Sequence, residues 1–134
     1  MAKIIERNVK DAVKKVLTDS KRSDIYFNMP VPAGYGTPTL DFIGCYMGLF
    51  FAIETKAPGK KPTPRQNAII LEMEQTGAAV FVIDNITDDA LAPLKEWLDA
   101  VDIWYGRGQR TAQGVGNTRR SASPKPIPTP QKAT

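Results

Sequence analysis

The fold of this chain is decided by the stretch LDFIGCYMGLFFAIETK, which covers residues 40–56. Two apolar segments, residues 39–46 and 49–56, flank Met47-Gly48, and a glycine in such a pair is typical of the two-residue turn between antiparallel strands. The stretch therefore predicts a β-hairpin. In a hairpin with this loop, residues that face each other across the two strands have numbers that sum to 95.

The hairpin brings three charged side chains together. The numbers of Asp41 and Glu54 sum to 95, so the two carboxylates are expected to face each other, with Cβ atoms about 4.5–5.5 Å apart. Lys56 lies two residues beyond Glu54 and therefore projects from the same face. Opposed carboxylates repel each other, and Mg²⁺ or Mn²⁺ would relieve that repulsion, with the Thr55 carbonyl as a further ligand if strand pairing leaves it free. The alternative interpretation is a charge cluster on a solvated face.

The segments around the hairpin predict three helices and one further strand. Apolar residues recur at helical spacing in residues 3–18, 64–76 and 87–100. Residues 78–83 predict a buried strand, parallel to its neighbour because a helix separates the two. Residues 19–38, rich in Pro and Gly, are expected to be mostly irregular, with or without a short strand. This order predicts an α/β fold, in which a mixed β-sheet with a β-hairpin is flanked by helices.

The composition restricts the chemistry that the chain can perform. Its 134 residues include no histidine and a single cysteine, Cys45. The lack of histidine excludes Ser-His-Asp and Cys-His catalysis and zinc sites that use histidine. One cysteine excludes an internal disulfide, and its position in an apolar run predicts a core residue. Hydrolytic chemistry would have to use carboxylates, lysine and a hard metal ion.

Charge is divided unevenly along the chain. Residues 1–105 hold twelve basic and fourteen acidic residues, a net charge of −2, whereas residues 106–134 hold six basic and no acidic residues. We expect one domain in 1–105 and a basic, disordered tail in 106–134, which either binds polyanions or only aids solubility. No apolar run is long enough to span a bilayer, and the start lacks a signal-peptide pattern. A cytoplasmic protein without membrane association is therefore expected.

An ordered set of motifs runs from Gly36 to Gln66. It comprises a Gly- and Pro-containing lead into Asp41, a β-turn, a Glu-x-Lys motif at the end of the next strand, a loop rich in Lys, Pro and Gly, and a Gln at the start of a helix. The set resembles the PD-(D/E)xK nuclease superfamily, and within it the virus-type replication-repair nuclease (VRR-NUC) domain, including small stand-alone bacteriophage members. The resemblance covers about residues 3–100. One departure is Leu40, which takes the place of the Pro before Asp41.

The resemblance implies an active site that uses Mg²⁺ or Mn²⁺. Asp41 and Glu54 would bind the metal, and Lys56 would orient or activate the attacking water and stabilise charge on the phosphate. The family often has a Glu on the first helix that faces the metal, and Glu6 is the matching residue. Glu6 could equally pair with Lys10, four residues further along the same helix.

Residues that follow the hairpin are given further roles by the resemblance. Gln66 would support the site from the next helix, unless it simply faces water at the helix start. Lys60, Lys61 and Arg65 are expected to contact DNA phosphates near the cut. The alternative for these three cations is an ordinary solvated loop.

The activity implied is that of a metal-dependent DNA endonuclease, acting on branched DNA such as a Holliday junction and present in the host cytoplasm if phage-encoded. The alternatives are a nickase or exonuclease on simple DNA, and a non-catalytic nucleic-acid-binding module. A two-fold symmetric substrate favours a homodimer. Candidate interface residues, each of which could instead cap the core of the monomer, are Tyr26, Phe27, Met29, Val31, Trp104 and Tyr105.

Overall fold

The structure is a computed structural model that describes residues 3–19, 22, 24–31, 34 and 36–105. These residues form a four-stranded mixed sheet and three helices, so the expected α/β class is confirmed. The basic tail predicted at residues 106–134 lies outside the described residues. Among the described residues, no helix has the length and apolar character needed to cross a membrane.

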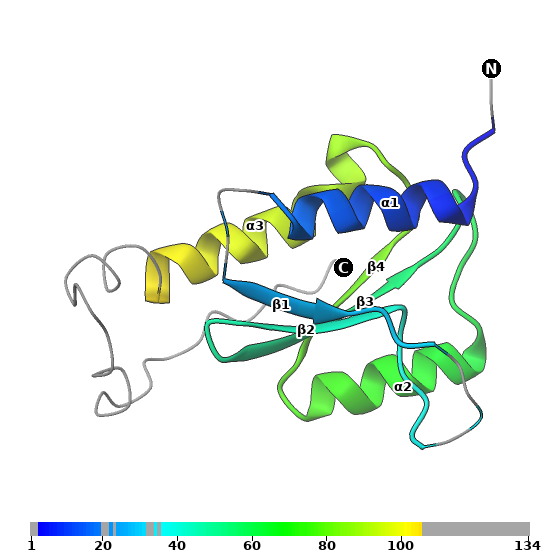
Figure 1. Ribbon diagram of the computed structural model, residues 1–134. Helices are drawn as coiled ribbons and strands as arrows, with labels where there is room; N and C mark the ends of the chain where they lie inside the picture. The colour runs from blue at the N-terminus through cyan, green and yellow to red at the C-terminus, as the bar shows by residue number, and fades with distance from the viewer. Residues whose placement is uncertain (1–2, 20–21, 23, 32–33, 35, 106–134) are drawn as a thin grey trace.

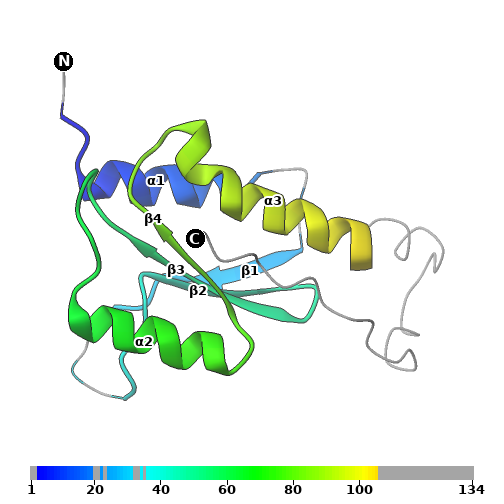
Figure 2. The same cartoon turned by 180° about the vertical axis from the view of Figure 1, so that it is seen from behind.

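Helices cover both faces of the sheet. The elements, in chain order, are α1 (Glu6–Leu17), β1 (Ile25–Asn28), β2 (Phe42–Tyr46), β3 (Leu49–Thr55), α2 (Pro64–Gln75), β4 (Ala79–Ile83) and α3 (Asp88–Tyr105). The strands lie in the order β1-β2-β3-β4, antiparallel except for the parallel pair β3–β4. Helices α1 and α3 pack on one face and α2 on the other (Figure 1 and Figure 2). The parallel pair and the helix between its strands agree with the sequence-based prediction.

The hairpin has the predicted register. Its pairs run from Phe42 opposite Ile53 to Tyr46 opposite Leu49, and the numbers in each pair sum to 95. Met47 and Gly48 both have positive φ angles, 54° and 85°. Two such residues are required by the type I′ turn, whose twist matches that of the flanking strands. The short strand β1, which the sequence left open, pairs with the outer side of β2.

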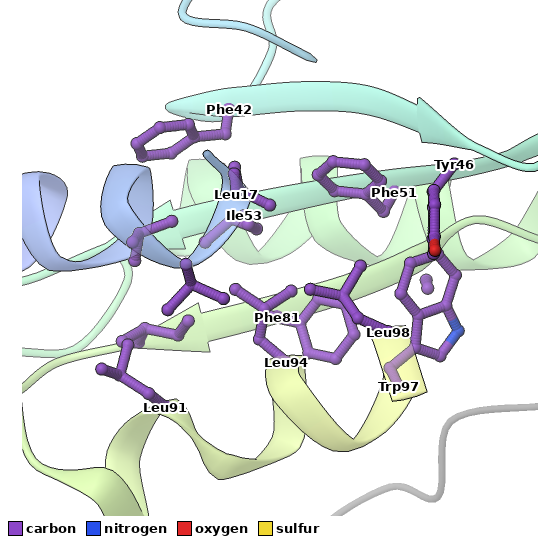
Figure 3. Close-up of a cluster of buried hydrophobic side chains, with 14 of the residues drawn as sticks. Leu17, Phe42, Tyr46, Phe51, Ile53, Phe81, Leu91, Leu94, Trp97 and Leu98 are labelled. Atoms are coloured by element: carbon purple, nitrogen blue, oxygen red, sulfur yellow. The ribbon is translucent and has the colours of Figure 1, made fainter. Parts of the chain in front are cut away.

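The core lies between the sheet and the helices α1 and α3. Alternate residues of β3 face this side, and Phe51 and Ile53 are fully buried there. The ring of Trp97 from α3 packs against those of Phe51 and Phe81, with centroids 5.8 Å apart in both pairs (Figure 3). Such tilted arrangements are favoured by the ring quadrupoles. The core thus fixes the direction in which β3 runs, and with it the position of the Glu-x-Lys motif.

Two sequence-based predictions about apolar residues were wrong. Cys45 is exposed, not buried, because it projects from the face opposite the core, in one cross-strand row with the exposed residues Tyr26 and Phe50. Helix α3 ends at Tyr105, not at residue 100. It continues because the buried Val101 extends its apolar stripe by one more turn.

A polar cluster ties the last turns of α3 to the rest of the fold. The side chain of Arg22, 9% exposed, donates to Asp102 from Nε at 3.2 Å and also pairs with Asp99. The other carboxylate oxygen of Asp102 accepts a hydrogen bond from the hydroxyl of the buried Tyr46. Because Arg22 and Asp102 are almost fully enclosed, the charge of each depends on the other.

Replacing Arg22 with methionine should therefore destabilise the fold. We expect Arg22→Met to lower the free energy of unfolding by about 2–4 kcal/mol, because Asp102 would keep a largely buried charge without its guanidinium partner. Urea denaturation followed by circular dichroism measures this. The exposed Arg7 on α1 is the matched control, and Arg7→Met should change stability by less than about 0.5 kcal/mol. Equal effects of both substitutions would contradict the assignment.

Candidate functional site

The candidate site lies where β2 begins and β3 ends. Strand β2 starts at Phe42, not at residue 39 as predicted, so Asp41 lies just outside the hairpin ladder. Its Oδ2 accepts two hydrogen bonds from Thr55, one from the main-chain N–H at 2.9 Å and one from the hydroxyl at 2.7 Å. The side chain of Asp41 therefore takes the N–H that a longer β2 would have paired. The predicted direct opposition of Asp41 and Glu54 within the ladder is replaced by this contact.

Glu54 is the penultimate residue of β3 and is 3% exposed. Its Oε2 lies 3.5 Å from the ammonium nitrogen of Lys56. Burial raises the pKa of Glu54 above its usual value, and the nearby negative charge of Asp41 raises it further. Lys56 and a hydrogen bond from the backbone of Asp41 act in the opposite direction. The two carboxylates therefore interact electrostatically, as the sequence predicted, although different partners hold them.

Helix α1 contributes two more charged groups to the same place. Its N-terminal half passes over the C-terminal end of β3 (Figure 1 and Figure 2). The ammonium nitrogen of Lys10 lies 3.3 Å from Oε2 of Glu6 and 3.8 Å from Oδ1 of Asp41. The alternative pairing of Glu6 with Lys10 is thus present in the structure. The same lysine also connects Glu6 to Asp41, so Glu6 lies at the edge of the site.

The main chain adds an oxygen on the side of Asp41. The N–H and C=O groups of one strand residue point to the same side of the strand. Since the N–H of Thr55 is directed to Asp41, the Thr55 carbonyl is directed to that side too. The next N–H, that of Lys56, goes to the other side, where it donates to the Ile83 carbonyl of β4 at 2.9 Å. Pairing with β4 therefore does not use the Thr55 carbonyl, which is directed to the site from a fully buried residue.

These oxygens are the donors that a hard divalent cation prefers. Two carboxylates and a main-chain carbonyl suit Mg²⁺ or Mn²⁺, and a buried carboxylate of raised pKa gains from an added positive charge. Within the described part of the chain, no three side chains among His, Cys, Asp and Glu are grouped closely enough to form a metal cluster on their own. The donor set thus consists of two acidic side chains and a carbonyl, with Glu6 held by Lys10.

The remaining sequence-predicted residues lie in the loop after β3 and at the start of α2. Lys60, Lys61 and Arg65 are all exposed. Gln66 closes a capping box: its Oε1 accepts from the N–H of Thr63 at 2.9 Å, and its own N–H donates to the Thr63 hydroxyl at 3.2 Å. Its side-chain oxygen is engaged there, so any contact with the site would involve the amide nitrogen.

Two contacts were not found from the sequence. One is the clamp formed by the N–H and hydroxyl of Thr55 on Asp41, since only the Thr55 carbonyl had been considered. The other is the contact of Lys10 with Asp41, which depends on how α1 packs over the sheet. The sequence did indicate the pairing of Lys10 with Glu6, since the two residues are four positions apart on one helix, but it did not indicate the contact of Lys10 with Asp41.

Comparison with models of known protein families finds no match for this chain, and comparison with curated proteins finds none either.

Because of Glu54, the stability of the metal-free protein should depend on pH. Since its pKa is raised on folding, the folded state binds the proton more tightly than the unfolded state, and stability falls as the pH rises from about 4.5 through the folded pKa. Glu54→Gln should therefore raise the melting temperature at pH 7 in the presence of a chelator. This gain should shrink as the pH is lowered towards 4.5.

Thermal denaturation of both proteins between pH 4 and pH 8 tests the expectation. Glu96→Gln, at an exposed position of α3, is the matched control and should show no gain that depends on pH. A loss of stability in Glu54→Gln at pH 7 would show that the ionised Glu54 stabilises the fold.

Proposed function

We propose that this chain is a metal-dependent DNA endonuclease of the PD-(D/E)xK type, similar to VRR-NUC domains. The observation that carries the proposal is the buried carboxylate of Glu54 at the end of β3, with Lys56 beside it and Asp41 clamped next to it. Burying a carboxylate beside a second one costs free energy, and such costs are typical of functional sites. The helix-flanked mixed sheet is compatible with this fold and supports the proposal.

Asp41 and Glu54 would hold a Mg²⁺ or Mn²⁺ ion, with the carbonyl of Thr55 as a third ligand. Bound there, the ion would lower the pKa of a water molecule and neutralise charge on the phosphate. The two hydrogen bonds from Thr55 fix one carboxylate oxygen of Asp41 and so orient the other. Side chains held in this way lose little freedom when a ligand binds, which favours a well-defined geometry.

Lys56 would act on the phosphate and the attacking water. Its side chain is 13% exposed, and its ammonium nitrogen lies 3.5 Å from Oε2 of Glu54, so Lys56 is held in a largely enclosed place. A positive donor in such a place stabilises developing negative charge more strongly than one in water does. Lys56 would therefore position the water and stabilise the transition state, while the carboxylates hold the metal.

DNA would approach over the exposed loop that follows β3. Lys60, Lys61 and Arg65 lie within eleven residues of Glu54 along the chain, and all three side chains are exposed. Contacts of such cations with phosphates position the duplex without reading its sequence. Gln66 supports the same region by fixing the first turn of α2.

Branched DNA remains the proposed substrate, cut by a homodimer. Of the six candidate interface residues, Phe27, Met29 and Tyr105 pack against the core of the monomer. Tyr26, Val31 and Trp104 are exposed, as is Ile103 next to Trp104. Tyr26 and Trp104 lie at the same end of the molecule. Asp102, two residues before Trp104 on α3, accepts a hydrogen bond from Tyr46, and Tyr46 pairs with Ile25, the neighbour of Tyr26. Tyr26 projects from the face of the sheet opposite α3, so an interface that uses both residues would have to wrap around this end of the molecule.

Substitutions in the site should separate metal binding from catalysis. Asp41→Asn and Glu54→Gln should each reduce cleavage of a labelled four-way junction in Mg²⁺ or Mn²⁺ to background, while DNA binding persists. Lys56→Met should lower turnover by roughly 10²–10³-fold, in the range of a lost transition-state donor, without weakening the affinity for Mn²⁺. Gel-based cleavage and calorimetry measure the two quantities.

Glu96→Gln, which removes an exposed carboxylate from α3, should cleave like the wild type. Full activity in Asp41→Asn or Glu54→Gln would refute the site. Cleavage of linear or nicked DNA in preference to junctions would instead favour the nickase or exonuclease alternative. Binding of DNA without cleavage in either metal would favour the non-catalytic module.

The homodimer has its own test. Light scattering after size exclusion should show a dimer for the wild type and a monomer for the double variant Tyr26→Ser, Trp104→Ser. Leu71→Ser, at an exposed apolar position of α2, is the control and should remain dimeric. A monomeric wild type that stays monomeric on junction DNA would contradict the dimer.

A further inference from the structure

Lys10 lies in the site, but the proposed mechanism gives it no role. Its ammonium nitrogen approaches two carboxylates that come from different elements, Glu6 on α1 and Asp41 before β2. The side chain of Lys10 is 33% exposed, and those of Glu6 and Asp41 are 42% and 25% exposed. The lysine is thus placed at the mouth of the site, between solvent and the clamped carboxylate.

The position of Lys10 is set by the other contacts of Asp41. Oδ2 of Asp41 is engaged by the N–H and hydroxyl of Thr55. Oδ1, the remaining oxygen, is the one that faces Lys10. A metal ion that binds Asp41 would therefore use Oδ1, the oxygen that faces the ammonium group of Lys10.

We propose that Lys10 is a positioning residue that serves as the resident counter-cation of the site and competes with the divalent metal for Asp41. This inference rests on the proposed function. Lys10 neutralises Glu6 and Asp41 while no metal is bound, and its ammonium group leaves Oδ1 of Asp41 when the metal enters. The metal affinity of the protein is set partly by the cost of that displacement.

Electrostatics and distances support competition over joint binding. Mg²⁺ contacts its oxygen ligands at about 2.0–2.1 Å, so a bound ion would bring two positive charges close to the ammonium group. Like charges at such separations repel strongly in a partly enclosed site. The flexible four-carbon stem of lysine and its partial exposure allow the group to move into solvent, at the cost of its two ion pairs.

Charge balance points the same way. The carboxylates of Glu6, Asp41 and Glu54 face the ammonium groups of Lys10 and Lys56, which leaves one formal negative charge. Without Lys10 the cluster would carry two formal negative charges and would attract a divalent cation more strongly. Lys10 therefore lowers the affinity for metal and also limits carboxylate repulsion in the metal-free protein.

The test is the Mn²⁺ affinity of the DNA-free protein, measured by titration calorimetry. Lys10→Met should bind Mn²⁺ roughly three- to tenfold more tightly than the wild type, the scale expected for losing two partly exposed ion pairs. Lys10→Arg keeps the charge and should restore an affinity close to that of the wild type. Lys14→Met is the matched control: it removes an exposed cation one helical turn further along α1 and should change the affinity less than twofold.

Unchanged or weaker Mn²⁺ binding in Lys10→Met, relative to Lys14→Met, overturns the inference. Lys10→Gln gives a second measurement of the same quantity if the methionine variant does not fold, as judged by circular dichroism. If the wild type cleaves DNA and Lys10→Met binds Mn²⁺ no better, the inference alone fails. If Lys10→Met binds more tightly but no DNA is cleaved, Lys10 keeps its role and the nuclease proposal fails. If no variant binds Mn²⁺, both fail.

Discussion

The carboxylate of Asp41 accepts both the main-chain N–H and the hydroxyl of Thr55, and the candidate site depends on this contact. By taking the N–H of Thr55, Asp41 replaces the next rung of the hairpin ladder, so β2 begins one residue later, at Phe42. Strand β3 continues past this point, and its last residues, Glu54 and Thr55, pair with β4 alone. At such an end the Thr55 carbonyl is directed to the side that β2 would have covered, in a fully buried position near two acidic side chains.

Glu54 shows that this arrangement is costly without a ligand. A carboxylate that is 3% exposed and shares its surroundings with Asp41 is only partly compensated by Lys56. The core beneath the sheet supplies the stability that permits such a cost, since Phe51 and Ile53 on the same strand are fully buried against α1 and α3. Lys10 and Lys56 hold the charges from two sides, one near solvent and one deeper in the fold. The charged groups of the site are thus held in place by contacts with one another and with Thr55.

The sequence predicted the parts of this structure that depend on local patterning. Alternation, turn residues and helical spacing were enough for the hairpin register, the parallel strand β4 and most of the helices. Features that depend on packing between distant segments were missed. Cys45 is exposed because α2 leaves part of one sheet face uncovered. Helix α3 continues to Tyr105 because Val101 is buried in the core. The same limit applies to Lys10, whose contact with Asp41 arises only when α1 packs across β3.

The central claim is that the end of β3 binds a divalent metal through Asp41 and Glu54. Amide NMR spectra recorded with substoichiometric Mn²⁺ test it most directly, because the paramagnetic ion broadens the signals of nearby residues first. The account predicts that the amide signals of residues 41 and 54–56 broaden at the lowest Mn²⁺ concentrations, while that of the core residue Val101 stays sharp. Broadening that begins elsewhere, or that is uniform along the chain, would contradict the claim.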